Sequence, residues 1–212
     1  MEKTINEQIV DEDLISEDFS IDGALIAEEE IRDGKKSICF RGVFSEADKM
    51  NRNHRIYPKH ILKEAFENAW NESVASGQPI YGELEHSSDA KCHLERIAVT
   101  FPELSWNEEK GQIVGKAIPT LTEAGQTVEK LAKSGFKICF STRCSGKVKP
   151  YHGPLAEGVN NAVEVQPGLK IISIDVVGTP SCQKAVTNTV YEGFEEPVKK
   201  GRTFKEIFDA EF

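Results

Sequence analysis

The sequence has no long hydrophobic run of the kind that crosses a membrane. No stretch approaches the roughly 18 to 20 apolar residues that a spanning helix needs. The N-terminus is acidic, whereas a secretory signal begins with basic residues followed by an apolar stretch. Hydrophobic residues still make up 39% of the 212-residue chain, which is enough to bury a sizeable core. We therefore expect one soluble domain with appendages and no membrane partner.

The number and spacing of the cysteines argue against two common uses. The five cysteines are odd in number and include no CxxC pair; they are Cys39, Cys92, Cys139, Cys144 and Cys182. This pattern argues against both a disulfide framework and a zinc ribbon, and it favours a reducing, cytoplasmic setting. We expect neither a metal nor another cofactor.

A net positive charge is missing as well. The chain carries a net charge of −9, and residues 1–34 contain twelve acidic and two basic residues, a net charge of −10. The remainder is therefore close to neutral at +1, so we expect no nucleic-acid partner. Isolated apolar pairs in the acidic segment, such as Leu14-Ile15 and Leu25-Ile26, are poor material for a core. They predict a mobile or partner-dependent arm.

Periodicity predicts few helices and many short strands. Apolar residues at helical spacing predict one helix from Pro58 to a stop at Gly77 and another from about Thr122 to Ser134. A capping-box pattern at Thr203 predicts a short third helix. Candidate strands are 38–44, 79–84, 96–101, 136–148 and 169–177, with a hairpin over 104–118. Without βαβ alternation, this favours an α+β fold with an antiparallel β-barrel-like core, two main packing helices and a short C-terminal helix.

Two polar residues stand where predicted strands would present them. His86 comes just past the strand 79–84, although a lone histidine is more often structural. Regular alternation along 136–148 would put Ser141 and Arg143 on one face of their strand. A serine hydroxyl is a weak nucleophile unless an imidazole within hydrogen-bond reach takes its proton. Catalysis and a solvent-facing hydroxyl both remain open for Ser141 on the residues alone.

A third polar residue, Asp175, lies near the centre of the strongly apolar strand 169–177. A carboxylate there is costly to bury unless it is paired or hydrogen-bonded. It could orient a histidine base and stabilise its imidazolium, or it could pair with a core arginine. A cation such as Arg143, or a pair of backbone N–H groups, would stabilise the oxyanion of a tetrahedral intermediate. The sequence does not separate these uses.

Competing sites are weaker. Five residues of metal-binding type lie within eleven positions, but their spacing matches no HExxH or Cys/His zinc pattern; they are Glu83, Glu85, His86, Cys92 and His93. Cys139 and Cys144 are better explained as buried structural cysteines than as thiol nucleophiles. His152 could be a second imidazole, but a surface loop is the plainer interpretation.

Four stretches together resemble the prohead core proteases of T-even-type bacteriophages. They are Asn51-Arg52-Asn53-x-Arg55-Ile56-Tyr57-Pro58-Lys59, Gly82-Glu83-Leu84-x-His86, Ser141-x-Arg143 and Asp175-x-Val177-x-x-Pro180-Ser181. Each is weak alone, but their order and spacing over residues 38–185 are specific. The family is related in fold to herpesvirus assemblins and to other tailed-phage prohead proteases, so the resemblance also implies a β-barrel-like core surrounded by helices.

The resemblance implies a serine endopeptidase and assigns its residues. The family's histidine falls on His86 and its nucleophilic serine on Ser141, with Asp175 as the third catalytic member. Arg143 and Thr142 would take part in oxyanion or substrate binding. The chain departs from the family beside the serine, where Thr142 and Cys144 stand in place of the expected Ser and Gly.

The resemblance also implies a setting and substrates. Such a protease works inside the viral prohead, in the host cytoplasm, and cleaves scaffold, capsid and internal proteins, preferring to cut after Glu in Ile/Leu-x-Glu contexts. Three such motifs in the acidic arm end at Glu7, Glu17 and Glu28. They suggest self-removal of a propeptide, although similar motifs recur elsewhere in the chain. We also expect a homo-oligomer.

These inferences divide the chain into three parts. Residues 1–34 form the acidic arm and candidate propeptide, 35–196 the protease domain, and 197–212 a basic linker with the short C-terminal helix. The alternative from another functional class is a non-enzymatic scaffold or capsid-assembly protein, which the acidic arm and basic linker would also suit. A metal hydrolase is a third interpretation.

Overall fold

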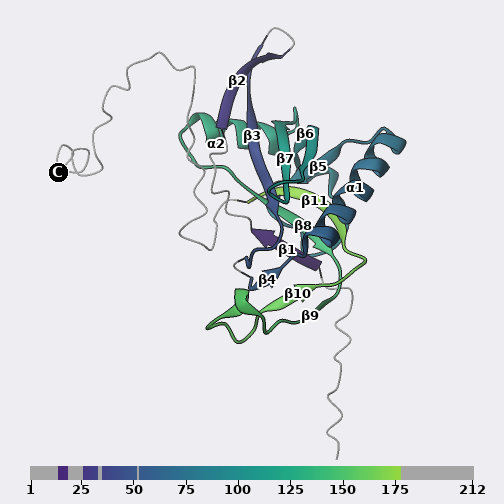
Figure 1. Cartoon of the computed structure of the whole chain (residues 1–212). Helices are drawn as coiled ribbons and strands as arrows, with labels where there is room; N and C mark the ends of the chain where they lie inside the picture. The colour runs from purple at the N-terminus through teal and green to yellow at the C-terminus, as the bar shows by residue number, and fades with distance from the viewer. Residues whose placement is uncertain (1–13, 19–25, 33–34, 52, 178–212) are drawn as a thin grey trace, which may run out of the picture.

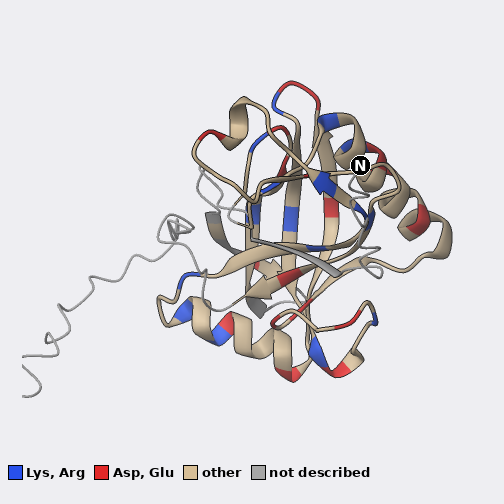
Figure 2. Ribbon diagram, turned by 90° about the horizontal axis from the view of Figure 1, so that it is seen from below, with Lys and Arg blue, Asp and Glu red and all other residues tan. Residues whose placement is uncertain are grey.

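The computed structural model describes residues 14–18, 26–32, 35–51 and 53–177 (Figure 1). The predicted helix at Thr203, the 197–212 segment and Cys182 lie outside the described residues. Within them, no helix is long and apolar enough to cross a membrane. Lys and Arg are interspersed with Asp and Glu over the described body (Figure 2), as expected for a nearly neutral body.

Three sheets make up most of the described structure. The largest is an antiparallel sheet with the order β2 (Ile26–Arg32), β3 (Lys35–Glu46), β7 (Gln112–Pro119), β6 (Ile97–Asn107) and β5 (Ile80–Glu83). The second has the order β1 (Leu14–Asp18), β8 (Cys139–Ser145) and β11 (Lys170–Val177). The third and smallest is β4 (Arg55–Ile56), β10 (Val163–Val165) and β9 (Val148–Pro150). Short 3-10 helices cover Leu94–Arg96 and Pro154–Ala156.

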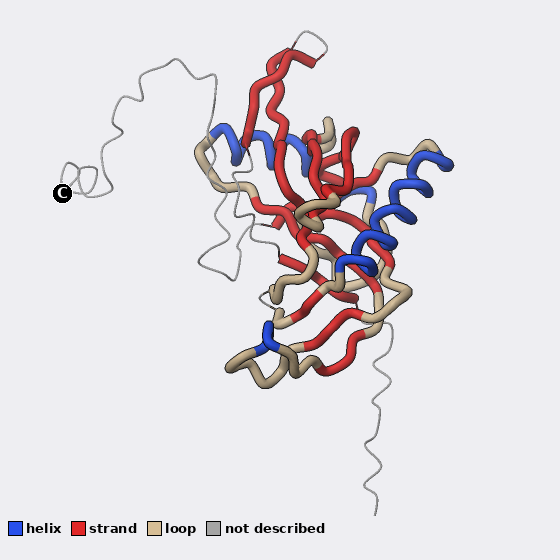
Figure 3. Tube along the Cα trace, in the orientation of Figure 1, coloured by secondary structure: helices blue, strands red, loops and turns tan. Residues whose placement is uncertain are grey.

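The two larger sheets meet where β5 reaches β11. Leu84 forms a parallel bridge with Val176, and the backbone N–H of Glu85 donates to the Val176 carbonyl at 2.8 Å. The two sheets lie together at this junction (Figure 3), and the buried side chains of both form a single hydrophobic core. The expected α+β fold with a barrel-like core is confirmed.

Aromatic side chains fill the space between the sheets. Phe44 of β3 makes edge-to-face contacts with Phe101 of β6 and Phe140 of β8, with ring centroids 5.0 and 5.2 Å apart. Phe40 meets the same Phe140 ring at 5.6 Å. Such contacts add to the stabilisation from apolar burial. They fix β8, the strand that carries Ser141, against the larger sheet.

Both predicted main helices are present. Helix α1 (Lys59–Ser76) buries Ile61, Leu62, Ala65 and Phe66 and ends at Gly77, whose φ of 68° is left-handed. Helix α2 (Glu123–Lys133) begins at Thr122, whose hydroxyl accepts the Gly125 N–H at 3.1 Å. Helix α1 packs on β11, β5 and β6, whereas α2 packs on β6 and β7.

The structure differs from the sequence prediction in its strands. The predicted strand 96–101 and the first arm of the hairpin form one continuous strand, β6, and the segment 136–148 divides into β8 and β9. The acidic arm contains two strands, β1 and β2, where no packed structure was expected. Edge strands of this kind gain much of their stability from backbone ladders, which leave little trace in side-chain patterns.

Candidate active site

The register between β8 and β11 brings polar residues together on one face. Ser141 lies opposite Asp175, and Arg143 lies opposite Ser173. Opposite residues in an antiparallel pair share a face, and the next residue along each strand points the other way. Accordingly, Ile174 and Phe140 belong to the hydrophobic core. The expectation that Ser141 and Arg143 share one face is met.

His86 follows the end of β5 and lies beside this face of β8 and β11. The chain pairs with β11 through Leu84 and Glu85 and then turns at Glu85, which has a φ of +64°. A non-glycine residue in this left-handed region is uncommon, and such strain tends to persist at functional sites. The turn places His86 beside the polar face of β8 and β11.

Three side chains there form a continuous hydrogen-bonded row. The Nε2 atom of His86 lies 2.7 Å from the Ser141 hydroxyl, and its Nδ1 atom lies 2.8 Å from Oδ2 of Asp175. An ionised carboxylate can only accept, so Nδ1 carries the proton and donates to Asp175. The lone pair of Nε2 is then free to accept the Ser141 O–H, as a general base requires. The structure thus unites His86, Ser141 and Asp175, which are far apart in sequence.

Asp175 is fully buried but well compensated. Its Oδ1 accepts the backbone N–H of Glu83 at 2.8 Å, and its Oδ2 lies 3.1 Å from Nε of Arg143. A buried carboxylate needs such partners to remain ionised. The sequence left two contacts open for Asp175, one with a histidine and one with a core arginine. In the structure Asp175 makes both, with His86 and with Arg143.

The side chain of Arg143 lies beneath the row of three side chains. It is fully buried, its Nη2 atom is 3.0 Å from Oε1 of Glu83, and its Nε atom donates to the Ser173 hydroxyl at 2.9 Å. A further N–H donates to the Asp89 carbonyl at 3.1 Å. The guanidinium is therefore paired with two buried carboxylates, Glu83 and Asp175. Any contribution of Arg143 to an oxyanion would come from its main chain.

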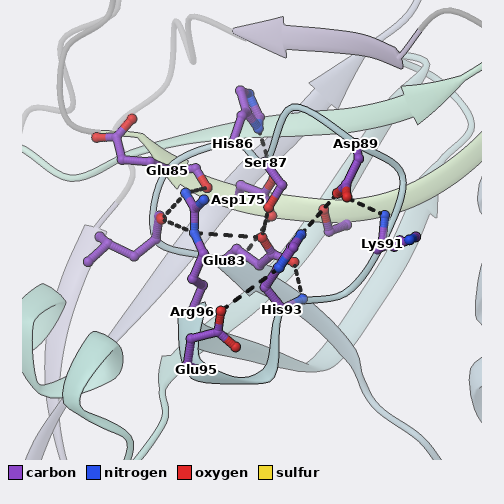
Figure 4. Close-up of polar contacts among 12 residues, drawn as sticks. Glu83, Glu85, His86, Ser87, Asp89, Lys91, His93, Glu95, Arg96 and Asp175 are labelled. Carbon is purple, nitrogen blue, oxygen red and sulfur yellow. Dashed lines mark hydrogen bonds and ion pairs between the residues drawn. The ribbon is translucent and has the colours of Figure 1, made fainter.

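Glu83 is a residue whose importance the sequence analysis missed. Its carboxylate accepts the Ser87 O–H and the His93 N–H (Figure 4). It also pairs with Arg143. Burial raises the pKa of Glu83, but these hydrogen bonds and the guanidinium charge outweigh burial and lower it. The sequence did contain an indication of this role, because Glu83, like Asp175, is an acidic residue within a largely apolar strand.

Other candidates lie apart from the row. The Thr142 hydroxyl donates to the Phe44 carbonyl at 3.4 Å, on the core face of β8. Cys139 and Cys144 are buried, and His152 is exposed. Among the described residues, no group of three or more His, Cys, Asp or Glu side chains is arranged to hold a metal ion.

Comparison with known proteins identifies the family. The sequence matches the family described as prohead core protein serine protease over residues 8–193. The chain belongs to this family. A curated relative, the prohead core protein protease of Enterobacteria phage T4, is 26% identical over 159 residues, covering 71% of this chain and 68% of the relative. The family resemblance inferred from the four motifs is confirmed.

A solved structure has the same fold. It is described as the structure of the bacteriophage T4 capsid assembly protease, and it matches with a TM-score of 0.67 at 24% identity. The match covers 79% of this chain and 98% of the T4 protein chain. With the family assignment, the chain is a prohead protease of the serine class.

Gly82 controls how closely β5 approaches β11, and Gly82→Ala should disturb the site. A Cβ atom there would lie 1.9 Å from the Ile174 carbonyl oxygen, so the strands must separate. We expect a loss of about 1–3 kcal/mol of unfolding free energy and a roughly 10²-fold fall in peptidase activity, because His86 shifts.

Gly135→Ala is the matched control. The added Cβ atom meets no neighbour, but the φ of Gly135 is left-handed, so the unfolding free energy should fall by about 1–2 kcal/mol while activity is unchanged. Equal activities in the two variants would contradict the prediction.

Proposed function

We propose that this chain is the serine endopeptidase of prohead maturation and acts by acyl transfer through Ser141, His86 and Asp175. The observation that carries the proposal is the row of contacts from Ser141 Oγ to His86 Nε2 and from His86 Nδ1 to Asp175 Oδ2, at 2.7 and 2.8 Å. Because Ser141 and Asp175 face each other across paired strands, the sheet holds two of the three groups in place.

Each group has a distinct task in this mechanism. The Ser141 hydroxyl attacks the substrate carbonyl while His86 accepts its proton, and His86 then gives that proton to the leaving amine. Asp175 holds the histidine ring in the required orientation and stabilises the imidazolium. Main-chain groups of Thr142 and Arg143 contact the substrate and its oxyanion. The Arg143 side chain acts from below by holding Asp175 in place.

The substrates follow from the family. We propose that the enzyme cleaves scaffold, capsid and internal proteins inside the prohead in the host cytoplasm, after Glu in Ile/Leu-x-Glu contexts. It also processes its own acidic arm, residues 1–34, and works as a homo-oligomer. The names of its T4 relatives, a prohead core protein protease and a capsid assembly protease, support this setting.

Two measurements on the purified full chain test the proposal. A fluorophosphonate, which reacts with activated serines, should add to one residue, Ser141, as located by peptide mass spectrometry. A synthetic peptide containing Ile-x-Glu should be cleaved after Glu. The matched Gln peptide should have a roughly 10- to 100-fold lower kcat/KM, because it loses a charge-assisted contact. An adduct on cysteine, or activity abolished by a chelator, would contradict the serine mechanism, and no adduct or cleavage would favour a scaffold role.

A further inference from the structure

Strand β1 of the acidic arm lies along the edge of β8, the strand that contains Ser141 (Figure 1). Strand β8 therefore has β11, with Asp175, on one side and β1 on the other. The β1–β8 register is antiparallel and pairs Asp18 with Ser141 and Glu17 with Thr142. A segment of the arm thus occupies the strand position next to the proposed nucleophile.

The sequence of β1 matches the proposed cleavage motif. Ile15-Ser16-Glu17 is an Ile-x-Glu tripeptide, so the bond that the protease would cut joins Glu17 to Asp18. In the observed register this bond lies between the positions opposite Thr142 and Ser141. Directly opposite residues in antiparallel strands have Cα atoms about 4.5–5.5 Å apart. The backbone of the Glu17–Asp18 bond is therefore held within about one strand spacing of Ser141.

Other Ile/Leu-x-Glu motifs among the described residues are held differently. Glu28 lies in β2 and pairs with Cys39 of β3, in the other large sheet. The motifs that end at Glu64 and Glu123 enter α-helices, and the motif that ends at Glu157 lies at a 3-10 helix, whereas a peptide that adds to a strand edge must be extended. Among the described residues, the register therefore singles out Glu17.

We propose that the edge of β8 is the binding site for an extended peptide substrate, and that β1 is the chain's own first occupant. This inference rests on the proposed function and makes it specific. In this arrangement, the main-chain groups of β8 pair with the residues before the cleaved bond, as when a peptide adds a strand to a sheet. While β1 pairs with this edge, no other strand can pair there, so β1 also excludes external substrates.

Release follows from cleavage of the occupant. The Ser141 Oγ bonds to the Glu17 carbonyl carbon, the bond to the Asp18 nitrogen breaks, and His86 passes the serine proton to that nitrogen. Water then hydrolyses the ester, which frees the Glu17 carboxylate and restores Ser141. The products are a peptide ending at Glu17 and a chain beginning at Asp18, whose β8 edge is open to other substrates. Because the occupant is tethered, this first cut should be intramolecular.

Matched full-length variants test the inference. We expect wild type and Glu28→Gln to lose residues 1–17 at the same first-order rate, unchanged by tenfold dilution. Glu17→Gln should retain these residues and cleave an added Ile-x-Glu peptide roughly 10- to 100-fold more slowly than processed wild type. Intact-mass spectrometry and peptide cleavage provide the two readouts.

The outcomes separate this inference from the proposed function. If Glu17→Gln cleaves the added peptide as fast as processed wild type, or if wild type is cut first at Glu28, the inference is overturned while the protease assignment stands. A cutting rate that rises with protein concentration would overturn intramolecular occupancy. If wild type cleaves neither itself nor the added peptide and Ser141 takes no fluorophosphonate, both proposals fail.

Discussion

Replacing Ser141 by alanine should lower kcat/KM for peptide cleavage by about 10³- to 10⁶-fold. The substitution removes the oxygen that attacks the substrate but leaves the contact between His86 and Asp175 in place. The side chain is small and lies on a strand paired on both sides, so the fold should be retained. Initial rates with an Ile-x-Glu peptide, together with a thermal unfolding curve, provide the measurement.

A matched control and a double variant sharpen this result. Ser145→Ala, at the far end of β8, should leave the rate within about twofold of wild type. Substitutions near the surface, away from the core and from buried polar networks, usually have small effects. His86→Ala combined with Ser141→Ala should be hardly slower than either variant alone, because residues that act as a unit are not additive. Residual activity of Ser141→Ala within tenfold of wild type would mean that another residue is the nucleophile.

Part of this site could be predicted from the sequence. Ser141 and Arg143 are two positions apart in a strand, so their shared face follows from alternation alone. Helices α1 and α2 could also be predicted, because their apolar residues recur at helical spacing. His86, Ser141 and Asp175 emerged from the order of four motifs, which carries family information that no single residue carries. The geometry then adds what the motifs do not contain, the two hydrogen bonds through His86.

The rest depended on register and on contacts between sheets. The pairing of β11 with β8 contains an irregularity between Ile171 and Ser173, and a one-residue slip would turn Asp175 to the opposite face. The partner of Arg143 could not be chosen either, because Glu83 comes from the end of a strand in the other sheet. Strand β1 was not predicted, because it is held by backbone hydrogen bonds to β8 and its sequence shows no alternation of apolar residues.

Arg143→Met should cause the largest loss of stability, about 3–5 kcal/mol of unfolding free energy. The guanidinium is fully buried and lies 3.0 Å from a Glu83 oxygen and 3.1 Å from an Asp175 oxygen. Methionine fills much of the volume but leaves two carboxylates without their shared counter-charge. Activity should fall as well, because Asp175 then loses a contact that holds it in place beside His86. Chemical denaturation and peptide cleavage measure the two effects.

An exposed ion pair provides the matched control. Arg41 lies 3.2 Å from Glu103, and both side chains are largely solvent-exposed. Arg41→Met should therefore change stability by no more than about 1 kcal/mol. Adding Glu83→Gln to Arg143→Met should restore part of the lost stability, since it removes one of the uncompensated charges. If Arg41→Met and Arg143→Met destabilise the protein equally, the buried ion pairs of Arg143 with Glu83 and Asp175 do not stabilise the fold.

The effect of Arg143→Met should also depend on pH. The pKa of Glu83 lies below its ordinary value of 4.5, because hydrogen bonds from Ser87 and His93 and the guanidinium of Arg143 together outweigh burial. A carboxyl group whose pKa is lowered by folding stabilises the fold above its unfolded pKa, and that contribution is lost as the pH falls through the folded pKa. In Arg143→Met, Glu83 can instead take up a proton and escape the cost of a buried charge. The stability gap between wild type and variant should therefore be widest near neutral pH and narrow below about pH 4.5. A gap that stays constant down to pH 3 would locate the loss in packing rather than in charge.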